Sequence, residues 1–187
     1  MPIRRDYHGV VPINAIVIDN RQPWRDKLVK RLETCYARAA FFPTVFPLVE
    51  RLCANPTDSL ADYNISAIRS IAEALGLDTS RFVRSSSLDI TARATDRLIA
   101  IVAAVGGTAY LAGGGSAGYQ DDQQFASAGV DLIYQSFRHP VYRQGPGQAF
   151  VQGLSCLDAL LHCGCEGTAA LLAQDRIAAG PSHGTCA

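Results

Sequence analysis

The sequence has no excess of charge of either sign, because 17 Lys and Arg residues balance 17 Asp and Glu residues. A basic surplus is the electrostatic footprint of proteins that bind nucleic acid or anionic membranes. The chain also lacks an apolar segment behind its charged N-terminus, and no run approaches the roughly 18 apolar residues that span a bilayer. We therefore expect a cytoplasmic protein with no nucleic-acid partner and no membrane partner.

A disulfide framework is also missing, although the chain has six cysteines. They are unevenly spread, and two of them fall inside apolar helical patterns, which favours reduced thiols. Two short Cys/His clusters, at residues 162–165 and 183–186, have poor spacing for tetrahedral zinc. We expect no metal and no cofactor, and a zinc-dependent protein is the less favoured alternative.

What the chain does have is a hydrophobic content of 48% over 187 residues, enough to bury one core. In its second half, helical patterns alternate with short apolar strands, which is typical of parallel βαβ units. We expect an α/β fold with a Rossmann-like three-layer arrangement, in which helices flank a mainly parallel sheet. This fold predicts a single domain over residues 1–172, followed by a loose tail over residues 173–187.

Local signals set the bounds of these elements. Pro23 suits the first turn of a helix, Ser59 is a typical N-cap, and Gly76 and Gly164 suit helix ends. The expected strands are residues 15–18, 82–86, 108–112 and 130–134, and the expected helices are residues 24–39, 45–53, 60–75, 95–105, 121–128 and 154–163.

A glycine-rich loop at residues 112–119 lies between an expected strand and an expected helix. In open parallel sheets, ligands bind beyond the carboxyl ends of the strands, and glycine lets the backbone approach them closely. The loop has neither a Walker A ending nor the spacing of a dinucleotide fingerprint. Ligand binding and a plain connection are equally favoured. The substrate contacts that we expect in the loop are Gly113, Gly114, Gly115 and Tyr119.

The next strand leads into residues 134–142, which contain the best candidate for a general base. Histidine exchanges protons near neutrality, so His139 is this candidate, with Gln135 or Tyr142 placed to orient its ring. Tyr134 is expected to contact substrate. The alternative is a histidine that only holds the loop together by hydrogen bonds.

The last expected helix places Ser155, Asp158 and His162 on one face by their three- and four-residue spacing. Ser155 is favoured as a helix cap. Asp158 is equally consistent with a capping box and with a catalytic role that orients the base.

The order of several short motifs resembles the WbqC-like protein family from near Met1 to about Leu172. No single motif is specific, but their order and spacing together are. The first half contributes Ile18-Asp19-Asn20, Trp24-Arg25, Lys27, Tyr36, Ala39 and Phe42. The second half contributes Thr95-Asp96-Arg97-Leu98, Tyr110-Leu111-Ala112-Gly113, Tyr119, Phe125, Ala128-Gly129, Gln135, His139-Pro140-Val141-Tyr142 and Leu154-Ser155-Cys156-Leu157-Asp158.

The sequence departs from the family pattern at Leu28, where the family has histidine, and at His162, where it has asparagine. Family members also begin with an additional strand and turn, so we expect an N-terminally shortened member. Such shortening would expose a strand edge that a partner must cover, which predicts a homodimer or a complex with a biosynthetic partner protein.

The resemblance implies a biosynthetic enzyme of bacterial surface-polysaccharide or specialised-metabolite clusters, acting on a small-molecule substrate. From the available side chains we expect acyl or aminoacyl transfer to an amine, with His139 as base and Gln135, Tyr142 or Asp158 orienting it. The alternative is a non-catalytic accessory module that binds a ligand or a partner.

Overall fold

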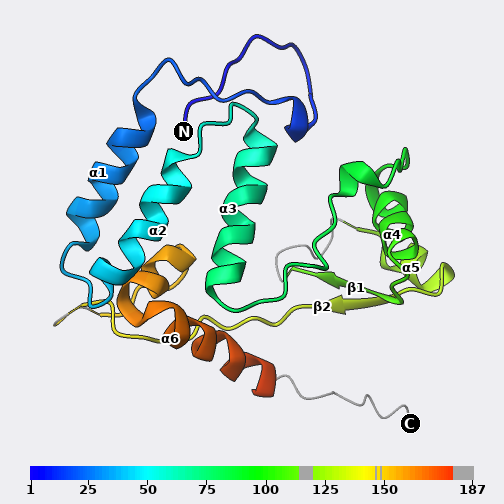
Figure 1. Ribbon diagram of the computed structural model, residues 1–187. Helices are drawn as coiled ribbons and strands as arrows, with labels where there is room; N and C mark the ends of the chain where they lie inside the picture. The colour runs from blue at the N-terminus through cyan, green and yellow to red at the C-terminus, as the bar shows by residue number, and fades with distance from the viewer. Residues whose placement is uncertain (114–119, 146, 148, 179–187) are drawn as a thin grey trace. The chain divides into compact units, whose positions relative to one another are not determined.

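The computed structural model describes residues 1–113, 120–145, 147 and 149–178 (Figure 1). The chain packs as two compact units: the first joins Met1–Thr79 to His139–Ala187, and the second is Ser80–Arg138. The second unit is thus inserted into the sequence of the first. Helices dominate, and a two-strand parallel sheet is flanked by helices. The expected single domain over residues 1–172 stays a prediction.

The strand expected at residues 15–18 is wrong. The 3-10 helix η1 (Ile13–Ala15) covers only the first of these residues, and Val17 and Ile18 form isolated antiparallel bridges with Ser59 and Ile3 in place of a continuous strand. Ile18 is fully buried. The apolar run therefore reflects burial, and pairing with two different segments prevents a continuous strand.

Three helices of the first unit begin or end on local signals. Helix α1 (Trp24–Tyr36) begins at the expected residue and ends three residues early. Helix α2 (Phe42–Ala54) begins earlier than expected because Pro43 occupies its first turn, where the missing N–H costs no helical hydrogen bond. Helix α3 (Leu60–Ala74) has the expected cap, since Ser59 Oγ accepts a hydrogen bond from the Asp62 N–H at 3.2 Å.

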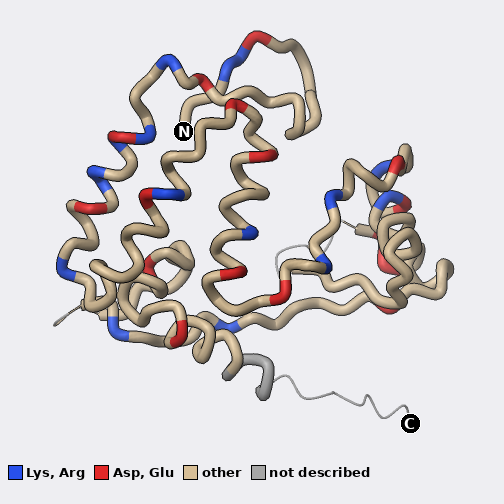
Figure 2. The backbone as a smooth tube through the Cα atoms, in the orientation of Figure 1, with Lys and Arg blue, Asp and Glu red and all other residues tan. Residues whose placement is uncertain are grey.

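Basic and acidic residues are interspersed along α1 (Figure 2), and one of them, Arg25, makes several contacts. Its guanidinium donates to the carbonyl oxygen of Asn55 at 2.7 and 3.0 Å and to that of Thr57 at 3.2 Å. It also lies 4.4 Å from the centre of the Trp24 ring. Arg25 therefore fixes the connection between α2 and α3 onto the start of α1.

The core of the first unit lies between α2 and α6 (Cys156–Ala178). Val49 of α2 and Leu160 and Leu161 of α6 are almost fully buried, and Ala39, Val45, Phe46 and Cys53 complete the cluster. Helix α6 breaks at Gly164, where φ is 74° and ψ is 175°. The expected helix end at Gly164 is therefore confirmed, but the second helical segment beyond it, which continues past residue 173, was not predicted.

Within α6, the window Cys156–Ala173 is long and apolar enough to cross a membrane by length and composition alone, the one such stretch among the described helices. The break at Gly164 interrupts this window. Leu160 and Leu161 belong to the core, and Asp158 within the same window is 3% exposed and hydrogen-bonded.

The second unit contains helix α4 (Ala94–Ala104), strand β1 (Ala109–Ala112), helix α5 (Asp122–Ser127) and strand β2 (Asp131–Tyr134). The strands are parallel, with Leu111 opposite Ile133. Phe125 is fully buried and stacks on Tyr110 at 5.4 Å between ring centres. This packing confirms a parallel strand–helix–strand unit.

The strand expected at residues 82–86 is wrong, because the chain there forms the 3-10 helix η2 (Ser85–Ser87). Phe82 and Val83 are 43% and 57% exposed. Without a neighbouring strand to pair with, β-prone residues do not form a strand. Among the described residues only β1 and β2 pair as strands, so the Rossmann-like three-layer arrangement is not confirmed.

Asp19 and Arg21 form a bidentate ion pair after the η1 segment. Arg21 Nε lies 2.7 Å from Asp19 Oδ1, and Nη2 lies 3.0 Å from Oδ2. Hydrogen bonding to Arg21, opposed by burial, lowers the pKa of the Asp19 carboxyl from 3.8 to about 2. Because the folded-state pKa lies below the unfolded value, this pair stabilises the fold above the unfolded pKa, and the contribution disappears as the pH falls through the folded one.

We expect the urea midpoint of the wild type to fall more steeply than that of Asp19→Asn as the pH is lowered from 3.8 to about 2. A carboxyl NMR titration of Arg21→Gln should show the pKa of Asp19 closer to its ordinary value. Equal acid sensitivity of wild type and Asp19→Asn would contradict this assignment.

Candidate functional site

A buried carboxylate lies at the centre of a polar network in the first unit. Asp158, in the first turn of α6, is 3% exposed. Its Oδ2 accepts hydrogen bonds from the Tyr142 hydroxyl at 2.7 Å and from Gln144 Nε2 at 3.1 Å. Both donors come from the segment that precedes α6, so a contact distant in sequence fixes the carboxylate.

His162 lies one helical turn beyond Asp158, with its Nε2 3.7 Å from Asp158 Oδ1. This separation is longer than a hydrogen bond and is within reach of an ion pair when the imidazole is protonated. The His162 side chain is 14% exposed, and its ring meets the edge of Tyr36 at 6.0 Å. The pair joins a buried acid to a proton-exchanging group that solvent still reaches.

Gln144 also anchors its own segment. Its Nε2 donates to the carbonyl oxygen of Val151 at 2.8 Å, and its Oε1 accepts from the Val151 N–H at 2.7 Å. The Gln144 amide therefore joins the two ends of the loop between residues 144 and 151 while it contacts Asp158. Such a rigid support keeps a functional carboxylate in one orientation.

Two tyrosines beside the carboxylate are weak acids. Burial, and secondly interaction with Asp158, raises the pKa of Tyr36 to about 12. Burial also raises the pKa of Tyr142 to about 12; Asp158 adds to this effect and Gln144 opposes it. Both hydroxyls therefore stay protonated near neutrality, and that of Tyr142 donates to the carboxylate.

The alkaline titration of the protein should report these two groups. Because their folded-state pKa values exceed the unfolded value of 10.0, their contribution to stability is complete below that pH and disappears as the pH rises towards about 12. Ultraviolet difference spectroscopy should show a group of tyrosines that ionise late, and Tyr36→Phe or Tyr142→Phe should each remove one tyrosine from the part that ionises near pH 12. A wild type in which every tyrosine ionises near pH 10 would contradict this prediction.

At the start of α6, Ser155 and Asp158 make different kinds of contact. Ser155 Oγ accepts from the Leu157 N–H at 3.3 Å, as expected of a cap. The Asp158 carboxylate instead binds Tyr142 and Gln144, so its described hydrogen bonds are not those of a capping box. The predicted spacing of Asp158 and His162 along one helix face is confirmed, whereas Ser155 precedes the helix and is exposed.

The other predicted residues lie in different places. Gly113 and Gln135 directly follow the neighbouring parallel strands β1 and β2, and the Gln135 N–H donates to the Ala112 carbonyl at 2.8 Å. Tyr134 donates its hydroxyl to Asp122 Oδ1 at 2.7 Å, an interaction that raises the pKa of Tyr134. All belong to the second unit. Gly114, Gly115 and Tyr119 lie outside the described residues.

His139, the expected base, is exposed and lies where the chain re-enters the first unit. The expected working segment, residues 134–142, is thus divided between the two units at residue 138. Of the four predicted catalytic residues, the structure brings together Tyr142 and Asp158. The roles of His139 and Gln135 stay predictions.

Sequence reasoning missed Gln144 and Tyr36 as members of this network. Gln144 belongs to a segment without helical or strand periodicity, so no local pattern distinguishes it from a loop residue. Tyr36 has the spacing of an apolar helix face, which predicts packing and does not reveal the nearby carboxylate.

In the described ranges, no three His, Cys, Asp or Glu side chains lie close enough together to hold a metal ion. Five described cysteines are unpaired thiols, and burial raises the pKa of Cys53 and Cys163. His183 and Cys186 of the second Cys/His cluster lie outside the described residues. The network around Asp158 itself contains carboxylate, imidazole and phenol groups, which can exchange protons.

The fold and this network define a helix-rich, mixed α/β protein with a buried carboxylate–histidine pair. Residues 1–170 match the sequence model of the WbqC-like protein family, and the chain belongs to that family. No curated protein and no solved structure matches the chain.

Proposed function

We propose that this WbqC-like protein is a biosynthetic enzyme that transfers an acyl or aminoacyl group to an amine. The observation that carries the proposal is the approach of His162 to the buried Asp158 carboxylate, at 3.7 Å. A histidine beside an oriented carboxylate is the usual arrangement of a general base. The reaction would serve bacterial polysaccharide or specialised-metabolite biosynthesis in the cytoplasm.

In the proposed step, the acceptor nitrogen attacks the carbonyl carbon of an activated ester or thioester donor. A carbon–nitrogen bond forms, the bond to the alcohol or thiol leaving group breaks, and the proton lost by the amine passes to His162. Asp158 stabilises the imidazolium that results, and Tyr142 and Gln144 keep the carboxylate in place. The proton then returns to the departing oxygen or sulfur, so the step needs no redox partner.

Substitution of each histidine can show whether His162 or His139 is the general base. Both positions should be replaced by Gln in the full chain, and each variant tested with a panel of acyl and aminoacyl thioesters and primary amines. We expect His162→Gln and Asp158→Asn to reduce amide formation at least about 100-fold, the lower range for loss of a general base. His139→Gln is the matched control and should retain most of the activity.

Mass spectrometry of the amide product provides the readout. Loss of activity in His139→Gln alone would return the base to His139, and full activity in both histidine variants would refute base catalysis by either. An absence of amide product from the wild type across the panel would refute the transferase proposal.

The second candidate is a non-catalytic accessory module that binds a ligand or a biosynthetic partner, either as a homodimer or as a complex. The double contact of Gln144 with Val151 favours it, because such a network also serves as a structural support. This candidate predicts that Asp158→Asn lowers the free energy of unfolding, and that neither the wild type nor the variant forms an amide product. Co-purification of a partner encoded beside the gene would support it.

A further inference from the structure

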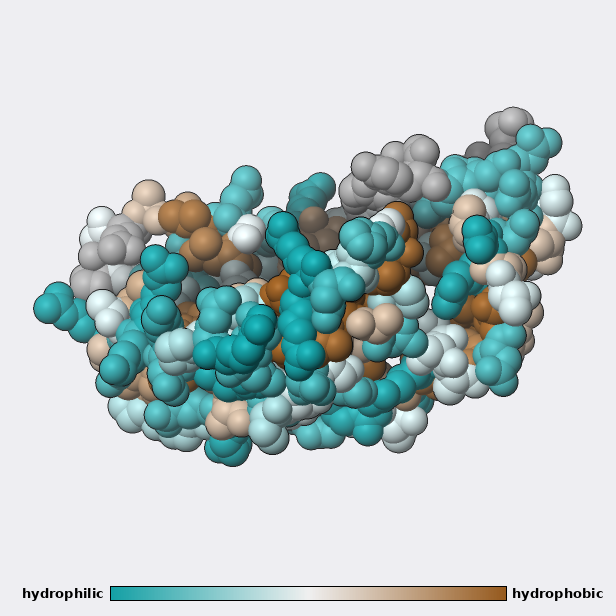
Figure 3. All heavy atoms as spheres, turned by 90° about the horizontal axis from the view of Figure 1, so that it is seen from above, coloured by the Kyte–Doolittle hydropathy of each residue, from teal (hydrophilic) through white to brown (hydrophobic). Residues whose placement is uncertain are grey.

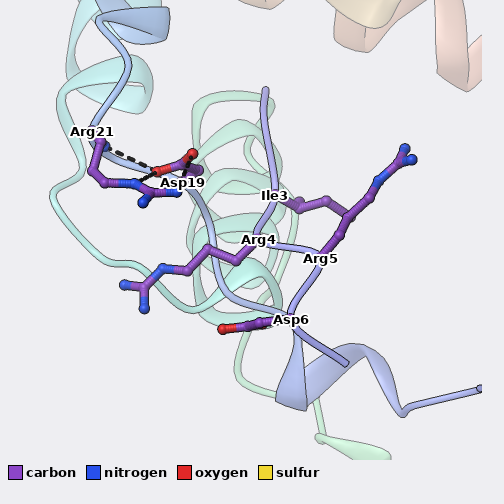
Figure 4. Close-up of a pocket in the computed structure, with 6 residues that line it drawn as sticks. All are labelled: Ile3, Arg4, Arg5, Asp6, Asp19 and Arg21. Atoms are coloured by element: carbon purple, nitrogen blue, oxygen red, sulfur yellow. Dashed lines mark hydrogen bonds and ion pairs between the residues drawn. The ribbon is translucent and has the colours of Figure 1, made fainter. Parts of the chain in front are cut away.

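A cavity of about 570 Å³ lies beside the N-terminal segment of the first unit, away from the Asp158 network in sequence. Small-molecule sites commonly have volumes of about 300–1,000 Å³. Five of the six residues that line it are charged: Arg4, Arg5, Asp6, Asp19 and Arg21, with Ile3 as the sixth (Figure 4). Figure 3 shows the molecule from above, with hydrophilic side chains over much of this face and hydrophobic ones between them.

On one wall of the cavity, the opposite charges of Asp19 and Arg21 neutralise each other. Asp19 and Arg21 pair through two hydrogen bonds at 2.7 and 3.0 Å. The pKa of Arg21 is raised chiefly by Asp19, and the charge of Asp6 contributes last. The contribution of Asp6 places its carboxylate near the same wall, and the remaining charges there belong to Arg4, Arg5 and Asp6.

Arg4 and Asp6 extend towards the side of Asp19 and Arg21, whereas Arg5 extends away from them (Figure 4). Alternate residues of an extended segment share a side, which explains this arrangement. Within the described part of the chain, neither the Arg4 guanidinium nor the Asp6 carboxylate forms a hydrogen bond or an ion pair. Besides the Asp19–Arg21 pair, the cavity therefore presents the cations Arg4 and Arg5 and the anion Asp6. Of these, Arg4 and Asp6 share one side and are not paired with each other.

The backbone beneath Arg4 is held by the segment that contains Ile18. The Arg4 N–H donates to the Val17 carbonyl at 2.9 Å, the Asp19 N–H donates to the Pro2 carbonyl at 3.0 Å, and Ile3 bridges to the buried Ile18. The backbone at Arg4 is thus fixed by three contacts, and Asp6 follows two residues later. Preorganisation of this kind reduces the entropic cost of binding.

We propose that this cavity binds a small zwitterion, in which Arg4 holds a carboxylate or phosphate and Asp6 holds a primary ammonium. Guanidinium pairs well with planar carboxylates and with phosphates, and a carboxylate accepts hydrogen bonds from an ammonium group. A ligand with only a negative charge would leave Asp6 without an oppositely charged partner, and a ligand with only a positive charge would leave Arg4 without one. An amino acid and an aminoalkyl phosphate share the required chemistry.

This inference deepens the proposed function, because an amino acid is a substrate class for aminoacyl transfer, but it is tested by binding alone. Isothermal titration calorimetry of the full chain should use the standard amino acids and phosphoethanolamine as probes. The tightest probe is then compared with its N-acetyl derivative and with its methyl ester, or for phosphoethanolamine with ethanolamine. We expect each blocked analogue to bind at least about tenfold more weakly.

Variants locate the site. Arg4→Gln and Asp6→Asn should each weaken the tightest probe at least about fivefold, whereas Arg38→Gln and Asp26→Asn, exposed positions outside the cavity, should leave its affinity unchanged. Absence of saturable binding, equal affinity for the blocked analogues, or equal losses in the control variants would each overturn the inference. Amide formation that survives in Arg4→Gln, although this variant no longer binds the zwitterion, would overturn the link between this cavity and the transferase substrate and leave the transferase proposal standing.

Discussion

Replacement of Gly164 by Ala is expected to lower the free energy of unfolding by about 3 kcal/mol. The backbone there has φ 74° and ψ 175°, a region that is essentially restricted to glycine. An added Cβ would also lie 2.7 Å from Cδ1 of Phe41, well inside van der Waals contact. Strain and overlap therefore act together at the point where α6 breaks.

Gly76→Ala is the matched control. Gly76 ends α3 with φ of +70°, but no atom lies within 4 Å of a Cβ built there. It should cost only about 1 kcal/mol, the conformational penalty alone. Urea denaturation measures both variants, and Phe41→Ala combined with Gly164→Ala should cost less than the sum of the single changes. Equal losses at the two glycines would show that the contact with Phe41 contributes nothing.

Replacement of Asp158 by Ala is expected to lower the free energy of unfolding by about 3 kcal/mol, because two donors lose their common acceptor. The Tyr142 hydroxyl and the Gln144 amide both bind Asp158 Oδ2. Asp26→Ala, an exposed acid in the first turn of α1, is the matched control and should cost about 0.5 kcal/mol.

A double-mutant cycle isolates the contact with the phenol. Tyr142→Phe should cost about 1 kcal/mol alone and much less in the Asp158→Ala background, because the hydroxyl has then already lost its acceptor. Additive losses in urea denaturation would mean that Tyr142 and Asp158 are energetically independent, and the network would not be the unit described above.

Signals confined to a few residues predicted much of the helical structure. These signals act within one helical turn, so they could be predicted from the sequence. They are the Ser59 cap, Pro23 before α1 and the glycine at residue 164. The expectations at residues 15–18 and 82–86 failed for the opposite reason. A continuous strand needs one continuous partner, which residues 82–86 lack and which two different segments replace at residues 17 and 18, and composition does not specify the partner.

The same distinction applies to the candidate site. The spacing of Asp158 and His162 is a property of one helix and could be predicted. The hydrogen bonds from Tyr142 and Gln144 join the segment before α6 to Asp158 within it, and no periodicity in the sequence predicts such contacts. His139 was selected for its chemistry and its place after a strand, and neither property states which side chains surround it.

The insertion of one unit into the other has a consequence during synthesis on the ribosome. The core around α2 needs Leu160 and Leu161, which emerge only after the whole of Ser80–Arg138. Domains generally fold as units while the chain emerges, so the inserted unit has all its own residues first, and the apolar faces of α1, α2 and α3 wait without their final partner. This interval is when the nascent chain is most exposed to aggregation and to capture by chaperones, and its length is set by the insertion.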